Sequence, residues 1–185
     1  MNTFNTTGKT MKKASVGIFF GSDTGNTEKL ANIIQLRIGK DLSDIFDISN
    51  SCKEDIENYD RLIFGIPTWY YGEPQCDWDS FLPIFRKINF LGKKIAIFGC
   101  GDQEDYSEYF CDAMSILYNI VINKGAIVVG LWPTSGYYFD MSKSIIDGNK
   151  FIGLAIDEDR QPDMTETRVK TWVKQIFLEM NLNLI

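Results

Sequence analysis

The sequence predicts an α/β fold of the three-layer type, in which helices cover both faces of a parallel sheet. Apolar runs alternate five times with segments whose apolar residues recur at helical spacing, as in 16–20 followed by 28–36. The runs are apolar throughout, as Leu62, Ile63 and Phe64 illustrate. Continuous apolar runs are typical of strands that are buried on both faces, and such strands usually form parallel sheets.

Several residues mark the boundaries of these elements. Gly39 stands where a helix C-cap is expected, and Thr165 is expected to be the N-cap of the last helix. Asp44 and Asp47 favour an edge position for the second strand, and the polar, Gly-rich segment 132–163 is expected to be a long loop. The strands are expected at about 16–20, 43–48, 61–65, 93–99 and 126–131, and the helices at about 28–39, 53–58, 77–88, 109–124 and 165–180.

Length, charge and composition limit the classes of function. The chain has 185 residues, which suits one domain, expected at 14–185 after a disordered extension at 1–13. The net charge of −6 argues against nucleic acid or an anionic membrane as partner. The absence of histidine removes the commonest general base and metal ligand. The four cysteines form no C-x-x-C pair, and neither a secretory signal nor a membrane-crossing run is seen, so we expect a cytoplasmic protein with reduced thiols.

The turn at 21–27, which follows the first apolar run, is rich in glycine and hydroxyl groups. Because it leads into a helix, its backbone N–H groups and the helix dipole suit a phosphate group. It contains no Lys or Arg and matches neither the P-loop nor the Gly-x-Gly-x-x-Gly pattern. A phosphate would therefore be bound by neutral donors, namely Ser22, Thr24, Asn26 and Thr27. The alternative is an ordinary polar turn with an N-cap at Ser22, Thr24 or Asn26.

Two further loops carry aromatic residues that would flank a planar ligand. Trp69, Tyr70 and Tyr71 follow the third strand, and Tyr106 follows the fourth. Because the carboxyl ends of parallel strands lie at one edge of the sheet, these loops should meet the turn at 21–27 there. Aromatic side chains stack well on a planar heteroaromatic ring. A phosphate attached to a flat ring, as in FMN, fits this combination.

The residues of these loops resemble the three FMN-binding loops of the bacterial flavodoxins. The similar segments are 22–27 (SDTGNT), 67–73 (PTWYYGE) and 99–106 (GCGDQEDY). Segments 132–137 and 153–159 resemble the inserted loop of the long-chain subgroup, and the similarity extends from Val16 to the C-terminal helix. The resemblance implies a five-stranded parallel sheet in the order 2-1-3-4-5, one non-covalent FMN, and one-electron transfer between redox proteins instead of enzymatic activity.

The resemblance also implies how the cofactor is bound. The turn would surround the phosphate, Thr68 and Asp159 would lie near the ribityl chain, and Trp69 and Tyr106 would cover the two faces of the ring. The residues expected to bind FMN are Ser22, Asp23, Thr24, Gly25, Asn26, Thr27, Pro67, Thr68, Trp69, Tyr70, Tyr71, Gly72, Gly99, Cys100, Gly101, Asp102, Tyr106 and Asp159. No metal ligands and no catalytic residues are expected. The Tyr70–Tyr71 link stands where some flavodoxins have Gly, so we expect weaker stabilisation of the one-electron-reduced flavin.

An acidic rim is expected around the flavin, and the three loops contain no Lys or Arg. The acidic rim consists of Glu73, Asp77, Asp79, Asp102, Glu104, Asp105 and Glu108. Its charge disfavours the anionic, fully reduced flavin, so we expect a low-potential carrier. By the resemblance, electrons would come from a basic NADPH-dependent flavodoxin/ferredoxin reductase and pass to acceptor redox enzymes. The contacts would be transient, and the protein is expected to be a monomer.

Two alternatives compete with electron transfer. An FMN-dependent NAD(P)H:quinone oxidoreductase has a similar fold but needs space for a second ring on the flavin, which Trp69 and Tyr106 would block. A phosphoacceptor receiver module has the same topology but needs clustered acidic residues at the end of the first strand. The residues there are Phe20, Gly21 and Ser22, so the sequence favours this module least.

Overall fold

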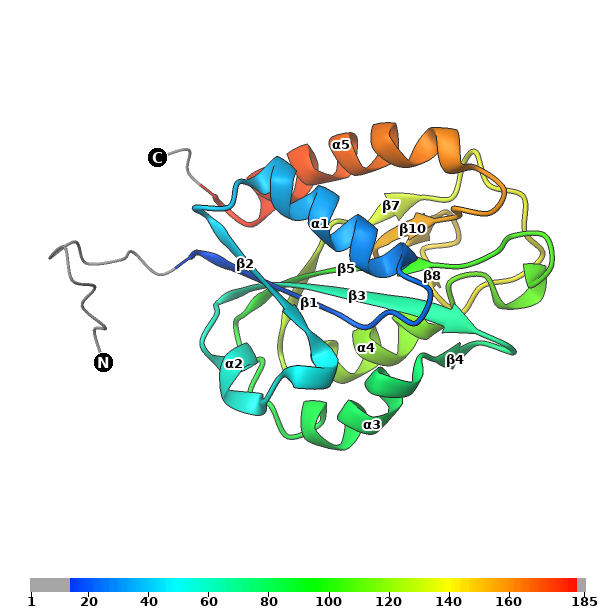
Figure 1. The fold of residues 1–185 in the computed structure, drawn as a ribbon. Coiled ribbons are helices and arrows are strands. Elements are labelled where there is room, and N and C mark those ends of the chain that lie inside the picture. Colours follow the sequence, from blue (N-terminus) through cyan, green and yellow to red (C-terminus); the bar gives the residue numbers. More distant parts are fainter. Residues whose placement is uncertain (1–13, 183–185) are drawn as a thin grey trace, which may run out of the picture.

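The computed structural model describes residues 14–182, in which helices cover both faces of a central parallel sheet (Figure 1). The order of the main strands is β2 (Ser43–Asp47), β1 (Val16–Phe20), β3 (Arg61–Trp69), β5 (Lys94–Cys100) and β10 (Leu154–Ile156). Each neighbouring pair on this path is parallel. The predicted fold class and the order 2-1-3-4-5 are therefore confirmed, with β2 at the predicted edge. The extension expected at 1–13 lies outside the described residues.

The helices divide between the two faces of the sheet. Figure 1 shows α1 and α5 on one face and α2, α3 and α4 on the other. The bounds are α1 Asn26–Ile38, α2 Lys53–Glu57, α3 Cys76–Phe85, α4 Ala113–Ile122 and α5 Pro162–Glu179, with 3-10 turns at Ile48–Asn50 and Ser107–Tyr109. Helix α3 buries Trp78, Phe81 and Phe85 against the sheet, as their helical spacing predicts. Gly39 is confirmed as the C-cap of α1, with a φ of 108°.

The fifth position of the sheet is shared by two short strands, a feature that the expected single strand at 126–131 misses. Strand β6 (Ile127–Val129) pairs with the first half of β5, and β10 pairs with its second half. Gly130 ends β6 with a φ of 77°, and its carbonyl accepts a hydrogen bond of 2.8 Å from the Trp172 indole. The chain leaves the sheet there because this left-handed residue turns it away from β5.

The segment expected to be a long loop contains regular structure. Strands β7 (Trp132–Pro133), β9 (Lys150–Phe151) and β8 (Ile145–Ile146) form a small antiparallel sheet. The chain then returns to the central sheet at Gly153, where a Cβ would lie 2.1 Å from the Ile97 carbonyl oxygen. Only glycine allows this approach of the two backbones, which positions β10 beside β5.

Two helix boundaries also differ from the prediction. Helix α5 begins at Pro162 with Gln161 as N-cap, whereas Thr165 lies buried in the first turn and donates to Glu158. Proline suits the first helical position, so the helix starts before the expected cap. The helix expected at 109–124 is interrupted at Cys111, which has a φ of 55°, and α4 starts after it. Within residues 14–182, none of the helices has the length and apolar character needed to cross a membrane.

Candidate functional site

A cavity of about 320 Å³ lies at the carboxyl ends of β1, β3, β5 and β10. Its lining consists of Ser22, Asp23, Thr24, Asn26, Thr27, Pro67, Thr68, Trp69, Tyr70, Cys100, Gly101, Asp102, Tyr106, Glu158 and Asp159. All three predicted loops contribute to it, because their parent strands are neighbours in the sheet. The volume falls in the range of small-molecule sites. The predicted convergence of the three loops is therefore present in the structure.

Four of the predicted binding residues do not line this cavity: Gly25, Tyr71, Gly72 and Gly99. Gly25 is the N-cap of α1, with a φ of 89°. Gly72 has a φ of 93° in the β3–β4 turn and packs on Asp112, while Gly99 packs on Met114. Tyr71 is 72% exposed. These residues shape the loops or the surface, and the sequence pattern alone does not separate such roles from direct lining.

The turn after β1 leaves several polar groups available to a ligand. Helix α1 has no side-chain N-cap, so the ordinary capped turn considered as the alternative is not observed. The Ser22 hydroxyl instead accepts a hydrogen bond of 3.1 Å from the Gly25 N–H. Thr27 is 1% exposed, and within the described residues its hydroxyl has the Cys100 sulfur, at 3.6 Å, as its single hydrogen-bond partner. A sulfur is a weak acceptor, so the Thr27 hydroxyl remains free for a stronger one.

The loop after β3 is a tight turn that places Trp69 at the cavity. Strand β4 (Glu73–Pro74) pairs antiparallel with the end of β3, and the Gly72 N–H donates to the Trp69 carbonyl over 3.1 Å. The Trp69 indole N–H is buried and has no hydrogen-bond partner within residues 14–182. Tyr70 has a φ of 44°, which is uncommon for an aromatic residue. The positive φ thus lies at the first residue of the Tyr70–Tyr71 link, and its effect on the one-electron-reduced flavin stays a prediction.

The loop after β5 is held by a buried polar network that sequence analysis missed. Asp157 is fully buried and accepts hydrogen bonds of 2.9 Å from the backbone N–H and the side-chain amide of Gln103. The side-chain oxygen Oε1 of Gln103 accepts a hydrogen bond from the Tyr138 backbone N–H over 2.6 Å. The inserted segment therefore supports the loop that carries Tyr106. The local sequence rarely predicts that a polar side chain such as Gln103 is buried, because its partners are distant in the chain.

Arg160 is a cation that pairs with the cavity residue Asp102 and that the loop sequences do not reveal. Its guanidinium bonds both oxygens of Asp102, over 3.0 and 2.9 Å, and also pairs with Glu104 and Asp105. Burial alone would raise the pKa of Asp102, but Arg160 and two backbone N–H groups hold it below its ordinary value. The acidic rim is thus partly neutralised on the β5 side by a residue outside the three loops, which themselves contain no Lys or Arg.

Two carboxylates from the loop after β10 complete the charge pattern. Glu158 lines the cavity, although it was not among the predicted residues, and it forms an ion pair of 2.8 Å with Lys29. Burial, together with Asp102 and Asp157, raises the pKa of Asp159. The cavity wall thus combines neutral donors from the turn with several carboxylates. Such a wall favours ligands that need hydrogen-bond donors and resists additional negative charge.

Comparisons with known proteins agree with this geometry. The family model described as flavodoxin matches residues 18–172. The chain is 59% identical over 170 residues to Flavodoxin 1 of Salmonella typhimurium, covering 92% of this chain and 97% of that protein. It is 60% identical over 169 residues to a flavodoxin of Haemophilus influenzae, covering 91% and 97%.

Solved structures show the same likeness. The structure of Fusobacterium nucleatum flavodoxin bound to flavin mononucleotide superimposes with a TM-score of 0.85 at 38% identity. The superposition covers 89% of this chain and 97% of that one. Fold, sequence and loop arrangement thus agree, and this chain belongs to the flavodoxin family.

Proposed function

We propose that this protein is a low-potential one-electron carrier that binds FMN non-covalently in the cavity. Flavodoxins are electron-transfer proteins and not enzymes, so the quinone oxidoreductase alternative is not favoured. The observation that carries the proposal is one cavity lined by a donor-rich turn, by Trp69 and by Tyr106. FMN has the corresponding parts, a phosphate and a planar ring.

The residues of the cavity fit FMN. The side chains of Thr24 and Asn26 line it and make no hydrogen bond within residues 14–182, so they are free to donate to a phosphate. The buried, unpartnered indole N–H of Trp69 adds a donor in the wall that carries the aromatic side chains. Because the turn has no Lys or Arg, phosphate binding rests on neutral donors and on the start of α1.

Each part of the wall has a distinct task in this proposal. Residues 22–27 bind the phosphate, and Thr68 and Asp159 lie near the ribityl chain. Trp69 and Tyr106 flank the ring and exclude water from it, while the backbone at Tyr70, Gly101 and Asp102 contacts its edges. Bound FMN would supply the one-electron redox chemistry, and the protein adjusts its potentials.

The charges of the wall support a low potential for the second electron. Asp102, Glu158 and Asp159 line the cavity; Asp102 forms an ion pair with Arg160, and Glu158 forms one with Lys29. Carboxylates disfavour the negative charge that the site acquires on full reduction. Arg160 moderates this effect without removing it.

The acidic rim supports the proposed partners. Glu73, Asp79, Glu104, Asp105 and Glu108 are exposed. Exposed carboxylates of this kind suit brief docking to a basic NADPH-dependent reductase and to acceptor enzymes. Docking of this kind weakens as salt rises. A monomer and a cytoplasmic location, both expected from the sequence, stay predictions, as does a single domain at 14–185.

Visible spectra of the purified full chain test the proposal. We expect a yellow protein that passes through a distinct one-electron-reduced spectrum during anaerobic photoreduction. A colourless chain that takes up no added FMN would refute the cofactor. Reductase-coupled turnover that is unaffected by ionic strength would refute docking through the acidic rim.

A further inference from the structure

Gln75 is a buried polar residue at the junction between the phosphate turn and α3. It is 1% exposed and is the N-cap of α3, where its side-chain oxygen Oε1 accepts a hydrogen bond of 3.2 Å from the Trp78 backbone N–H. Its amide nitrogen donates to Asp23 over 2.8 Å and to Asp77 over 2.5 Å. Both ends of the side chain are thus used, one to cap a helix and the other to bind carboxylates.

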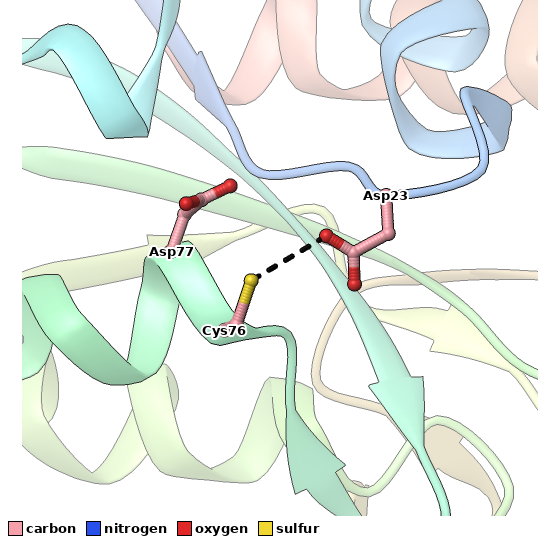
Figure 2. A group of neighbouring side chains, drawn as sticks. All are labelled: Asp23, Cys76 and Asp77. Atoms are coloured by element: carbon pink, nitrogen blue, oxygen red, sulfur yellow. Dashed lines mark hydrogen bonds between the residues drawn. The ribbon is translucent and has the colours of Figure 1, made fainter.

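The groups around this amide nitrogen form a compact cluster. Figure 2 shows that Asp23, from the turn after β1, directs its carboxylate toward Cys76 and Asp77 at the start of α3. The Cys76 thiol donates to Asp23 over 3.6 Å. Burial and the two carboxylates raise the pKa of Cys76, so the thiol keeps the proton with which it donates. Asp23 is therefore held by two donors, the Gln75 amide and the Cys76 thiol.

Backbone packing fixes Gln75 relative to the turn. A Cβ on Gly21 would lie 2.4 Å from the side-chain oxygen Oε1 of Gln75, so the start of the turn is in close contact with this side chain. The Gly65 carbonyl accepts from the Gly21 N–H over 3.2 Å and from the Trp78 indole over 2.8 Å. The turn and the start of α3 are thus joined through one carbonyl, and Gln75 has little freedom to move away from Asp23.

The orientation of Asp23 matters because this residue also lines the cavity. A carboxylate that turned toward a bound phosphate would repel it, and the turn has no cation to compensate. Held toward α3, the same carboxylate lies away from that position. The orientation of the Asp23 carboxylate would have a smaller effect on the binding of a flavin that carries no phosphate, because its ring is uncharged.

We propose that Gln75 is a positioning residue that gives the cavity its preference for phosphorylated over unphosphorylated flavin, by holding the Asp23 carboxylate toward α3. This inference rests on the proposed function, since it assumes that FMN binds in the cavity. It assigns to a residue outside the cavity lining a role in ligand selection. The role is exerted through Asp23, and Gln75 itself need not touch the ligand.

The test compares the affinities of the flavin-free full chain for FMN and for riboflavin. In Gln75→Met, which keeps the side-chain length but removes the amide, we expect FMN affinity to fall about tenfold while riboflavin affinity changes less than about twofold. In the double variant Gln75→Met with Asp23→Asn, FMN affinity should recover, because the freed side chain carries no charge. Gln35→Met, at a glutamine that bonds the Ser43 carbonyl far from the cavity, serves as the control.

Other outcomes separate this inference from the proposed function. An equal fall for both flavins would show a merely structural role for Gln75, and a double variant that stays weak for FMN would exclude action through Asp23. If Gln75→Met does not fold, Gln75→Glu keeps the helix-capping oxygen and should weaken FMN more than riboflavin; equal weakening would overturn the proposal. A wild-type chain that binds neither flavin would refute the proposed function itself.

Discussion

Replacing Thr27 by valine should separate phosphate binding from the stability of the protein. Thr27 is 1% exposed in the first turn of α1 and lines the cavity. Valine has the same shape but no hydroxyl, so the change removes one hydrogen bond to a phosphate. A hydrogen bond to a charged group contributes about 1.5–3 kcal/mol, which corresponds to a loss of FMN affinity of roughly 10- to 150-fold.

The flavin-free protein should be almost unaffected by the same change. In the part of the chain that the structure describes, the hydroxyl bonds only the Cys100 sulfur, at 3.6 Å, so its loss should cost less than about 1 kcal/mol of unfolding free energy. Fluorescence titration with FMN and with riboflavin, together with urea unfolding of the flavin-free chain, measures both quantities. Riboflavin affinity should stay constant.

Two controls make the result decisive. Thr27→Ser keeps the hydroxyl and should retain most of the FMN affinity, whereas Thr171→Val removes an exposed hydroxyl on α5 and should change neither quantity. The reasoning is refuted if Thr27→Val binds FMN within about twofold of the wild type. It is equally refuted if the two flavins lose affinity together.

Three further changes test other parts of the site. Arg160→Gln should raise the pKa of Asp102 toward its ordinary value, because the cation that lowers it is lost, and should lower the second one-electron potential; NMR and redox titrations would show both shifts. Gly153→Ala should destabilise the protein by at least about 2 kcal/mol in urea unfolding, because a Cβ there would lie 2.1 Å from the Ile97 carbonyl oxygen. Tyr71→Gly should stabilise the one-electron-reduced state of bound flavin, because glycine adopts a positive φ at the Tyr70–Tyr71 link at less cost. A redox titration that finds an unchanged gap between the two one-electron potentials would contradict this expectation.

The parts of the site that could be predicted share one property: each is formed by a short, continuous segment of the chain. The turn at 22–27, the aromatic residues at 69–71 and the loop with Tyr106 each follow an apolar strand, so their position at one sheet edge follows from parallel topology. Cys100 and Gly101, at the end of β5, were placed at the cavity by the same reasoning. The order of the strands came from the resemblance to a family, not from local pattern.

The remaining features depend on contacts between residues far apart in the chain. Arg160 meets Asp102 across 58 positions, and Gln75 meets Asp23 across 52, so no local pattern indicates either pair. A polar side chain such as Gln103 looks like a surface residue until its buried partner, Asp157, is known.

The sequence by itself determined the alternation of strands and helices, the parallel sheet and the three loops that build the cavity, because apolar runs, glycines and turn residues act on their immediate neighbours. Tertiary structure alone decided that two short strands share the fifth position, since Gly130 and Gly153 fit backbones that meet only in the folded chain. It also decided the charge of the cavity and the orientation of Asp23, because electrostatic interactions follow distance in space and not separation along the chain.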